Sequence, residues 1–328
     1  MNIQTIPIKE IQLEGPNFDD FIFTYPLNSR DLVDSIKKVG LLHPVCLRTY
    51  MEGWQIVYGA KRILACKELG WHEIPAQIVS VEEVSDMRAL EMSLAEDILQ
   101  RALNPIEKAM VFYKYQILGN WQISRLVNEL APQLGLPQSV EMVQNYISLL
   151  KLEKEIKIAV AHGSLTPAHA FLLLPLKPAE RITIFKEVFK KCNPNLNEGR
   201  EVINNLIDLK AIFKESIAEI LSNKTMEDFL NSPTKSPREK CGLLRMELKK
   251  LRYPRLSNLE SKFYQALNNL SLKNNIQVRP SPYFEENHLD IAFRIKDPAD
   301  LKQTLDSLTG ASKNGGIDKL FEIVKGEL

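Results

Sequence analysis

The chain has 328 residues, of which 45% are apolar and 25% charged, a composition typical of globular proteins that bury real cores. Its 42 Lys and Arg residues nearly balance its 41 Asp and Glu residues, which excludes a uniformly basic coat for nucleic acid but allows a local basic patch. No apolar run approaches the roughly 18 residues that span a bilayer. The four cysteines lie far apart, which argues against a disulfide scaffold or a zinc site. Since the first residues do not read as a signal peptide, we expect a cytoplasmic protein with no membrane partner.

The first hundred residues predict short strands that alternate with helices. Strands are expected over residues 3–11, 44–48, 54–58 and 74–79. A helix capped at Asn28 should end at Gly40, and a second helix, over residues 61–69, should end at Gly70. The pattern predicts a small α/β domain over residues 1–104.

From Asn104 onward, apolar residues recur at helical spacing as far as Phe229. Asn104 and Thr166 are expected helix caps, because each precedes a proline at the first helical position, where its missing N–H costs nothing. A polar stretch rich in proline and serine follows and is interpreted as a linker over residues 231–240. We therefore expect an all-helical domain over residues 105–230.

Residues 241–328 predict a third, small α/β domain, which completes an α+β fold class. A helical stripe of apolar residues precedes a short strand over residues 276–279. Leu289, Ile291, Phe293 and Ile295 then alternate with polar residues, the period of a half-buried strand. Because a two-stranded sheet is marginal alone, this domain should pack on its own helices or on another copy of the chain. It is thus a candidate for dimerisation.

Several ordered motifs are recognisable. They are Ser35-Ile-Lys-Lys-Val-Gly-Leu-Leu-His-Pro-Val45, Gly59-Ala-Lys-Arg62, Ile74-Pro75, Glu96-Asp-Ile-Leu-Gln-Arg-Ala-Leu-Asn-Pro-Ile-Glu-Lys-Ala109, Leu149-Leu-Lys-Leu152 and Gly163-Ser-Leu-Thr-Pro-Ala-His-Ala170. Together, over roughly residues 1–175, they resemble the ParB partition proteins, with a ParB/sulfiredoxin-like domain followed by a helix-turn-helix domain.

This resemblance implies a homodimer that binds double-stranded DNA in chromosome or plasmid partition, or in related transcription regulation. It also implies association with the nucleoid, a partition ATPase as a possible partner, and CTP with Mg²⁺ as possible cofactors that gate DNA binding. The nucleotide-binding residues implied are Gly40, His43, Gly59, Lys61, Arg62, Glu96 and Asp97, with Glu96 and Asp97 as the candidate Mg²⁺ ligands. Such residues suit this chemistry: a glycine-led turn that opens a helix offers N–H groups to phosphate, arginine adds charge-assisted bonds, and carboxylates suit Mg²⁺.

The chain departs from the family pattern in each nucleotide segment. Residues 23–27 carry no basic residue where the family has an arginine, and the Gly-Glu-Arg-Arg turn is Gly59-Ala-Lys-Arg62. In the Glu-Asn-x-x-Arg segment Asp97 replaces Asn, and Arg101 is displaced by one position, about 100° on a helix. These changes argue against CTP hydrolysis and leave CTP binding open, so no catalytic residue is assigned.

Residues 121–152 predict the helix-turn-helix itself. Its first helix places Ile123, Leu126, Val127 and Leu130 on the core, and its second, after a break at residues 135–137, points Val143, Tyr146, Ile147 and Leu150 inward. The expected DNA-binding residues are Gln138, Ser139, Gln144, Asn145, Ser148, Lys151 and Arg125. Gln and Asn amides can contact adenine edges through two hydrogen bonds, whereas an ordinary polar solvent face is the alternative interpretation.

One further charge signal and two further function classes stay open. Residues 235–255 contain eight Lys and Arg against two Glu, which predicts either a solvated helix face or a second contact to the DNA backbone. A nucleotide-dependent enzyme of the small-molecule kinase type could use Glu96 or Asp97 as a base, but would have no use for the helical region. Sulfiredoxin chemistry needs a cysteine in the phosphate turn, where this chain has Ala60. The second further class is a pure interaction protein that has neither a nucleotide site nor a DNA-reading helix.

Overall fold

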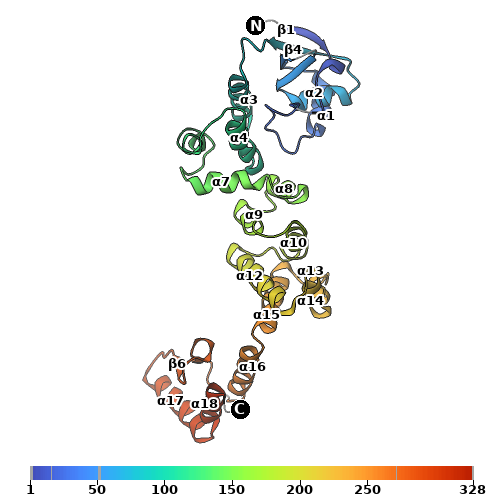
Figure 1. The fold of residues 1–328 in the computed structure, drawn as a ribbon. Helices are drawn as coiled ribbons and strands as arrows, with labels where there is room; N and C mark the ends of the chain where they lie inside the picture. Colours follow the sequence, from blue (N-terminus) through green and yellow to red (C-terminus); the bar gives the residue numbers. More distant parts are fainter. Residues whose placement is uncertain (1–2, 16, 51–52, 271, 327–328) are drawn as a thin grey trace. The chain divides into compact units, whose positions relative to one another are not determined.

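A computed structural model describes residues 3–15, 17–50, 53–270 and 272–326. The chain divides into two compact units, residues 1–189 and 190–328 (Figure 1). The first unit holds a four-stranded sheet and a run of helices, and the second holds helices and a two-stranded sheet. The predicted α+β class is confirmed. None of the helices in the described part of the chain is both long and apolar enough to cross a membrane.

The sheet of the first unit has the order β1-β4-β2-β3. Its strands are β1 (Ile3–Pro7), β2 (Val45–Tyr50), β3 (Gly53–Tyr58) and β4 (Glu73–Val79). β4 pairs antiparallel with β1 and parallel with β2, and β2 pairs antiparallel with β3. The strand predicted over residues 3–11 is too long, because the backbone turns into a 3₁₀ helix (η1, Ile8–Glu10) directly after Pro7.

Two helices pack together and close the core of this sheet (Figure 1). They are α1 (Arg30–Val39) and α2 (Ala60–Glu68). The predicted ends at Gly40 and Gly70 are confirmed, since both glycines take the positive φ that closes a helix. The predicted cap at Asn28 is wrong by one residue: Ser29 precedes α1, and its hydroxyl donates to Glu68 instead of capping.

The first unit continues as helices. They are α3 (Asp86–Gln100), α4 (Pro105–Ile117), α5 (Ile123–Arg125), the π-turn η2 (Leu126–Leu130), α6 (Ala131–Gln133), α7 (Val140–Leu149), α8 (Lys154–Ala161), α9 (Pro167–Leu173), α10 (Pro178–Ile184) and the π-turn η3 (Phe185–Phe189). The predicted caps are confirmed. The Asn104 side chain accepts from two amides of α4, and the Thr166 hydroxyl accepts from the His169 amide.

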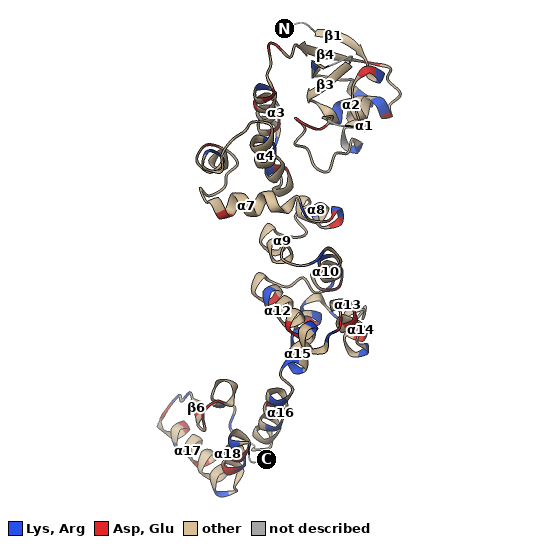
Figure 2. Ribbon diagram, in the orientation of Figure 1, with Lys and Arg blue, Asp and Glu red and all other residues tan. Residues whose placement is uncertain are grey.

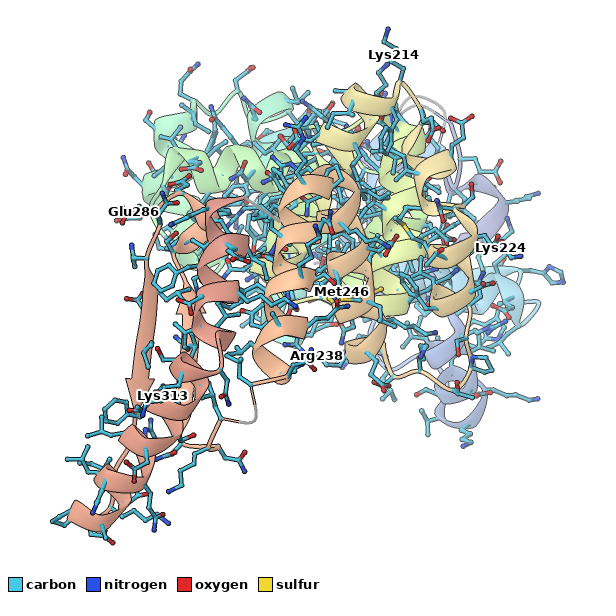
Figure 3. The ribbon with its side chains drawn as sticks, turned by 90° about the horizontal axis from the view of Figure 1, so that it is seen from below. Lys214, Lys224, Arg238, Met246, Glu286 and Lys313 are labelled. Carbon is cyan, nitrogen blue, oxygen red and sulfur yellow. The ribbon has the colours of Figure 1, made fainter. Side chains whose placement is uncertain are left out.

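The second unit begins with five helices. They are α11 (Lys190–Cys192), α12 (Leu196–Phe213), α13 (Ile217–Leu221), α14 (Lys224–Leu230) and α15 (Pro237–Arg252). Residues 231–236 form a loop, whereas 237–240 already belong to α15, which packs on α12 and α14. Arg238 lies in the first turn of α15, and Met246 lies further along it (Figure 3).

Helix α15 carries several Lys and Arg residues (Figure 2), and most of them have an acidic partner. Arg238 and Arg245 contact Glu198, Arg252 contacts Asp208, and Lys249 contacts Glu260. Because acidic residues of α12 and α16 neutralise these cations, the structure favours a solvated helix face over a free basic patch.

The last part of the second unit is a small α/β arrangement. Its elements are α16 (Pro254–Asn268), β5 (Ile276–Pro280), the turn η4 (Pro282–Phe284), β6 (Leu289–Phe293), α17 (Pro298–Lys313) and α18 (Gly316–Lys325). β5 and β6 pair antiparallel, with Val278 opposite Ile291. The expectation that β6 is half-buried within the chain is wrong, since Ile291 and Phe293 are 42% and 38% exposed. The helical core covers Ile276 and Val278 of β5 and reaches β6 only at its first residue, Leu289.

Candidate nucleic-acid and nucleotide sites

Helix α7 is the second helix of the helix-turn-helix, and its inner face fixes it in the unit. The Ser139 hydroxyl caps it by accepting from the Met142 amide, 3.3 Å away. Val143, Tyr146 and Leu149 are buried, and the Tyr146 ring packs edge-on against Phe112 of α4. Because the apolar face holds the helix, its polar face is free to contact a partner.

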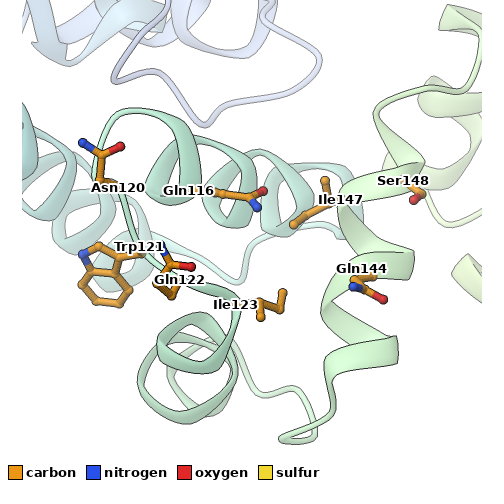
Figure 4. A pocket seen from close by; sticks show the side chains of 8 residues that line it. All are labelled: Gln116, Asn120, Trp121, Gln122, Ile123, Gln144, Ile147 and Ser148. Carbon is orange, nitrogen blue, oxygen red and sulfur yellow. The ribbon is translucent and has the colours of Figure 1, made fainter.

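That polar face lines an open groove of about 840 Å³ between α4, α5 and α7 (Figure 4). The lining residues are Gln116, Asn120, Trp121, Gln122, Ile123, Gln144, Ile147 and Ser148. Ile123 and Ile147, both predicted to face the core, are only half-buried and lie in this groove.

The groove brings two predicted DNA-binding residues, Gln144 and Ser148, together with three polar residues that the sequence did not single out, Gln116, Asn120 and Gln122. For Asn120 and Gln122 a sequence signal does exist, because they lie in the short break between two helices that follows Gly119, whereas Gln116 lies within α4. Amides gathered in one groove suit base edges and phosphate oxygens alike.

The remaining predicted DNA-binding residues fall into two groups. Asn145 is half-buried and Lys151 is exposed, neither lining the groove. Three others already have partners: Ser139 caps α7, the Gln138 amide donates to the Asn128 carbonyl, and the Arg125 guanidinium lies 3.7 Å from the centre of the Trp121 ring and pairs with Glu129. A direct role of these residues in DNA binding stays a prediction.

A second candidate site lies at the glycine turn between β3 and α2. Gly59 has φ +95°, and a Cβ at this position would lie 2.8 Å from Cγ1 of Val45, so both conformation and space require glycine. The turn opens α2, whose first N–H groups can receive a phosphate. Helix α2 thus presents the kind of terminus that the sequence predicts.

Arg62 ties this turn to two other predicted segments. Its guanidinium donates to the carbonyls of His43 and Pro44 at 3.2 and 3.0 Å, and it pairs with Glu96 at 2.7 Å. The structure therefore brings together Gly59, the loop after Gly40, Arg62 and the end of α3. It also shows that the arginine predicted to bind phosphate is already engaged by a carboxylate.

The two candidate magnesium ligands lie in different surroundings. Burial raises the pKa of Asp97 to about 6, against the opposing charge of Arg101. Glu96 accepts from Arg62 and from the Gln100 amide. Among the described residues, no group of three or more metal-binding side chains is assembled, so these two carboxylates fit Mg²⁺ only together with phosphate oxygens.

The displaced Arg101 points away from the glycine turn. Both of its terminal nitrogens bond the carboxylate of Glu107, at 2.6 and 2.8 Å. Glu107 is 1% exposed and also accepts from the amides of Asn104 and Tyr25. Arg101 lies just past the end of α3 with extended backbone, and its side chain belongs to a structural cluster at the start of α4.

Residues 19–25, which we call the strap, overlap the segment where the family has its arginine. Side chains of α3 and α4 and of the Asn104 cap hold the strap backbone. The Ser93 hydroxyl donates to the Phe21 carbonyl, Lys114 donates to the carbonyls of Asp19 and Ile22, and the Asn104 amide donates to the Tyr25 carbonyl. In this chain the segment is bound to the helices.

Comparisons with known proteins agree with this description. The ParB N-terminal domain matches residues 1–98, and the ParB HTH domain matches residues 101–206. The chromosome-partitioning protein Spo0J of Thermus thermophilus is 33% identical over 162 residues, which are 49% of this chain and 56% of that protein, so the chain spans little more than half of this relative. The nucleoid occlusion protein of Bacillus thuringiensis is 32% identical over 216 residues, which are 63% of this chain and 68% of that protein.

Solved structures of ParB also match, with low overall superposition. A C-terminally truncated ParB from Caulobacter crescentus complexed to the centromeric parS site is 21% identical, with a TM-score of 0.33 over 61% of this chain and 98% of that one. The same truncated protein complexed with CTP-gamma-S is 24% identical, with a TM-score of 0.25 over 57% and 98%. From the two domain matches and the identity to the nucleoid occlusion protein, the chain belongs to the ParB family.

Proposed function

We propose that this ParB-family protein binds double-stranded DNA in chromosome partition or nucleoid occlusion and reads its site with α7. The observation that carries the proposal is the division of α7 into two faces. Its apolar face is buried, and its polar face opens on the groove that holds Gln144 and Ser148. Helix-turn-helix proteins place such a face in the major groove.

Replacing Gln144 and Asn145 together by alanine is expected to weaken sequence-specific binding about ten- to hundredfold, because one bidentate amide–base contact discriminates by about 1–3 kcal/mol. Binding to random duplex, which depends on phosphate contacts, should survive. The measurement is fluorescence anisotropy with a duplex selected by the wild-type protein from a random pool. Asn204→Ala, which removes an exposed amide from α12, is the control. If specific and random binding fall together, α7 is not the reading helix.

We infer that the glycine turn binds a nucleoside triphosphate, with CTP as the nucleotide implied by the resemblance. The support is the N-terminus of α2 at Gly59, with Arg62 and Glu96 beside it. A bound magnesium nucleotide would supply phosphate oxygens that share the metal with Glu96 and Asp97. Arg62 must exchange Glu96 for phosphate in that state, so the ion pair makes nucleotide binding compete with an existing contact.

Arg62→Ala should abolish CTP binding in the presence of Mg²⁺, as measured by isothermal titration calorimetry. The reason is the loss of a charge-assisted donor at the phosphates. Arg200→Ala, which removes an exposed arginine from α12 in the second unit, is the control. An unchanged CTP affinity in the Arg62 variant would show that the pocket is elsewhere.

A homodimer completes the proposal, since two-fold symmetric sites are read by two-fold symmetric proteins. Its support is the sheet face on which Ile276 and Val278 are buried while their partners on β6, Phe293 and Ile291, remain exposed. A second copy can cover these two side chains. Association with the nucleoid and association with a partition ATPase, both implied by the resemblance, are further proposals. The second is tested by adding the purified chain to a partition ATPase and measuring whether the ATPase hydrolyses ATP faster.

The double variant Ile291→Lys, Phe293→Lys should be monomeric in light scattering at concentrations where the wild type is dimeric. Two lysines placed on a shared apolar face would have to be buried without partners. Val39→Lys is the control, because Val39 is also apolar and exposed but lies in the first unit. A variant that stays dimeric would assign the interface to another surface.

One observation weighs against a sulfiredoxin-type enzyme. Two cysteines lie near the phosphate turn, Cys46 opposite Tyr58 in the sheet and Cys66 on α2, and both are fully buried, which raises the pKa of each thiol. A thiol with a raised pKa is a poor nucleophile at neutral pH.

A further inference from the structure

A hydrogen bond between a side chain and the backbone crosses the turn that joins the two helices of the helix-turn-helix. The helix before it, from Ile123 to Gln133, carries Pro132 in its last turn, two residues after the end of the π-helical segment η2. Proline has no N–H, so the Asn128 carbonyl, four residues earlier, receives no ordinary helical bond from position 132. The side-chain amide of Gln138 donates to this carbonyl from beyond the turn, at 3.2 Å.

The backbone bonds on either side of Gly135 close the first helix. Gly135, with φ +67°, closes the first helix, and the Leu136 amide donates to the Ala131 carbonyl at 2.9 Å. Gln138 lies two residues after Leu136 and directly before Ser139, the cap of α7. The Gln138–Asn128 bond therefore joins the residue before the cap of the second helix to the body of the first helix.

We infer that Gln138 is a positioning residue, which supplies the donor that Pro132 lacks and thereby sets where the polar face of α7 lies. This inference rests on the proposed DNA binding and replaces the role of base contact that the sequence predicts for Gln138. Gln144 and Ser148 would read DNA, and Gln138 would hold them in place. The pairing of a helix proline with a glutamine six residues later explains both residues by one contact.

A double-mutant cycle tests the inference, because an alanine at position 132 would return the missing N–H. Gln138→Ala alone should weaken binding to the selected duplex about three- to tenfold, the range for one net hydrogen bond. The same change in a Pro132→Ala background should weaken it less than about twofold. Gln133→Ala is the matched control, since its amide donates to the Glu129 carbonyl at 2.8 Å within the first helix and crosses no turn.

Two outcomes would overturn the inference. An equal loss from Gln138→Ala in both backgrounds would show that Gln138 touches DNA itself, and reselection of the duplex would then show a changed preference at one base. No loss in either background would show that the bond does not position α7.

A DNA-free measurement separates this inference from the proposed function. Hydrogen exchange of the first amides of α7 should speed up with Gln138→Ala in the proline background and stay the same in the alanine background. That pattern would support the role of the Gln138–Asn128 bond in holding the start of α7, whatever the DNA results. If the wild type selected no duplex from the random pool, only the proposal of sequence-specific DNA binding would fail. Exchange rates that are equal in all variants would show that the Gln138–Asn128 bond does not hold the start of α7, whatever the DNA results.

Discussion

Glu107→Ala is expected to lower the free energy of unfolding of the first unit by about 3–5 kcal/mol, the range for breaking a buried ionic contact by removing one partner. The Glu107 side chain is 2% exposed and accepts from both terminal nitrogens of Arg101 and from the amides of Tyr25 and Asn104. Alanine leaves these donors without an acceptor, and two of them are backbone groups that cannot move to water.

Urea unfolding followed by tryptophan fluorescence measures this loss. Trp54, Trp71 and Trp121 are the only tryptophans of the chain and all lie in the first unit, so their signal reports that unit. Glu91→Ala is the control, because the exposed Glu91–Arg88 pair should contribute less than about 1 kcal/mol. A Glu107 variant no less stable than the Glu91 variant would mean that the cluster adds nothing to the fold.

Lys114→Met is expected to change how stability depends on pH. Lys114 is buried on α4, donates to the carbonyls of Asp19 and Ile22, and lies over the Phe23 ring. Burial lowers the pKa of its ammonium group from 10.5 to about 8, against the opposing charges of Asp19 and Asp20. In the unfolded chain the pKa returns to its ordinary value.

Between about pH 8 and 10.5 the unfolded chain therefore holds a proton that the folded chain has released. The free energy of unfolding therefore rises with pH through this window. The gain disappears as pH falls back to about 8, below which Lys114 is protonated in both states. The rise can reach the order of 3 kcal/mol in wild type and should be missing in the methionine variant. Groups common to both proteins cancel when the two unfolding curves are subtracted at each pH.

The measurement is the difference in unfolding free energy between wild type and variant from pH 7 to 10. Lys37→Met, on the exposed face of α1, should give a difference that stays flat over this range. If the Lys114 difference is equally flat, the lysine does not release its proton on folding.

Local signals were enough to predict most helix ends and the α/β character of both ends of the chain. Asn104 followed by Pro105, and Thr166 followed by Pro167, are caps whose chemistry lies within a few residues. What failed depended on contacts distant in sequence. The exposure of Ile291 depends on how far the helical core extends over the sheet, and no spacing within β6 records that.

The candidate sites divide in the same way. Gln144 and Ser148 follow from helical spacing alone, whereas Gln116 and Gln122 join them only because α4 packs against α7. The direction of Arg101 depends on Glu107, a capping residue whose carboxylate also serves the strap. Sequence patterns predict on which face of a helix a residue lies, but not with which distant residue a charged side chain forms an ion pair.

The strap also bears on how the chain can be divided. Its backbone groups are satisfied by Ser93, Asn104, Glu107 and Lys114, three of which lie beyond residue 98, where the match to the ParB N-terminal domain ends. A fragment cut at that border would carry the strap without most of its donors and acceptors. The borders of the family match and of the cooperative folding unit therefore differ, and the sheet and α4, which lines the groove with Gln144 and Ser148, should gain their final structure together.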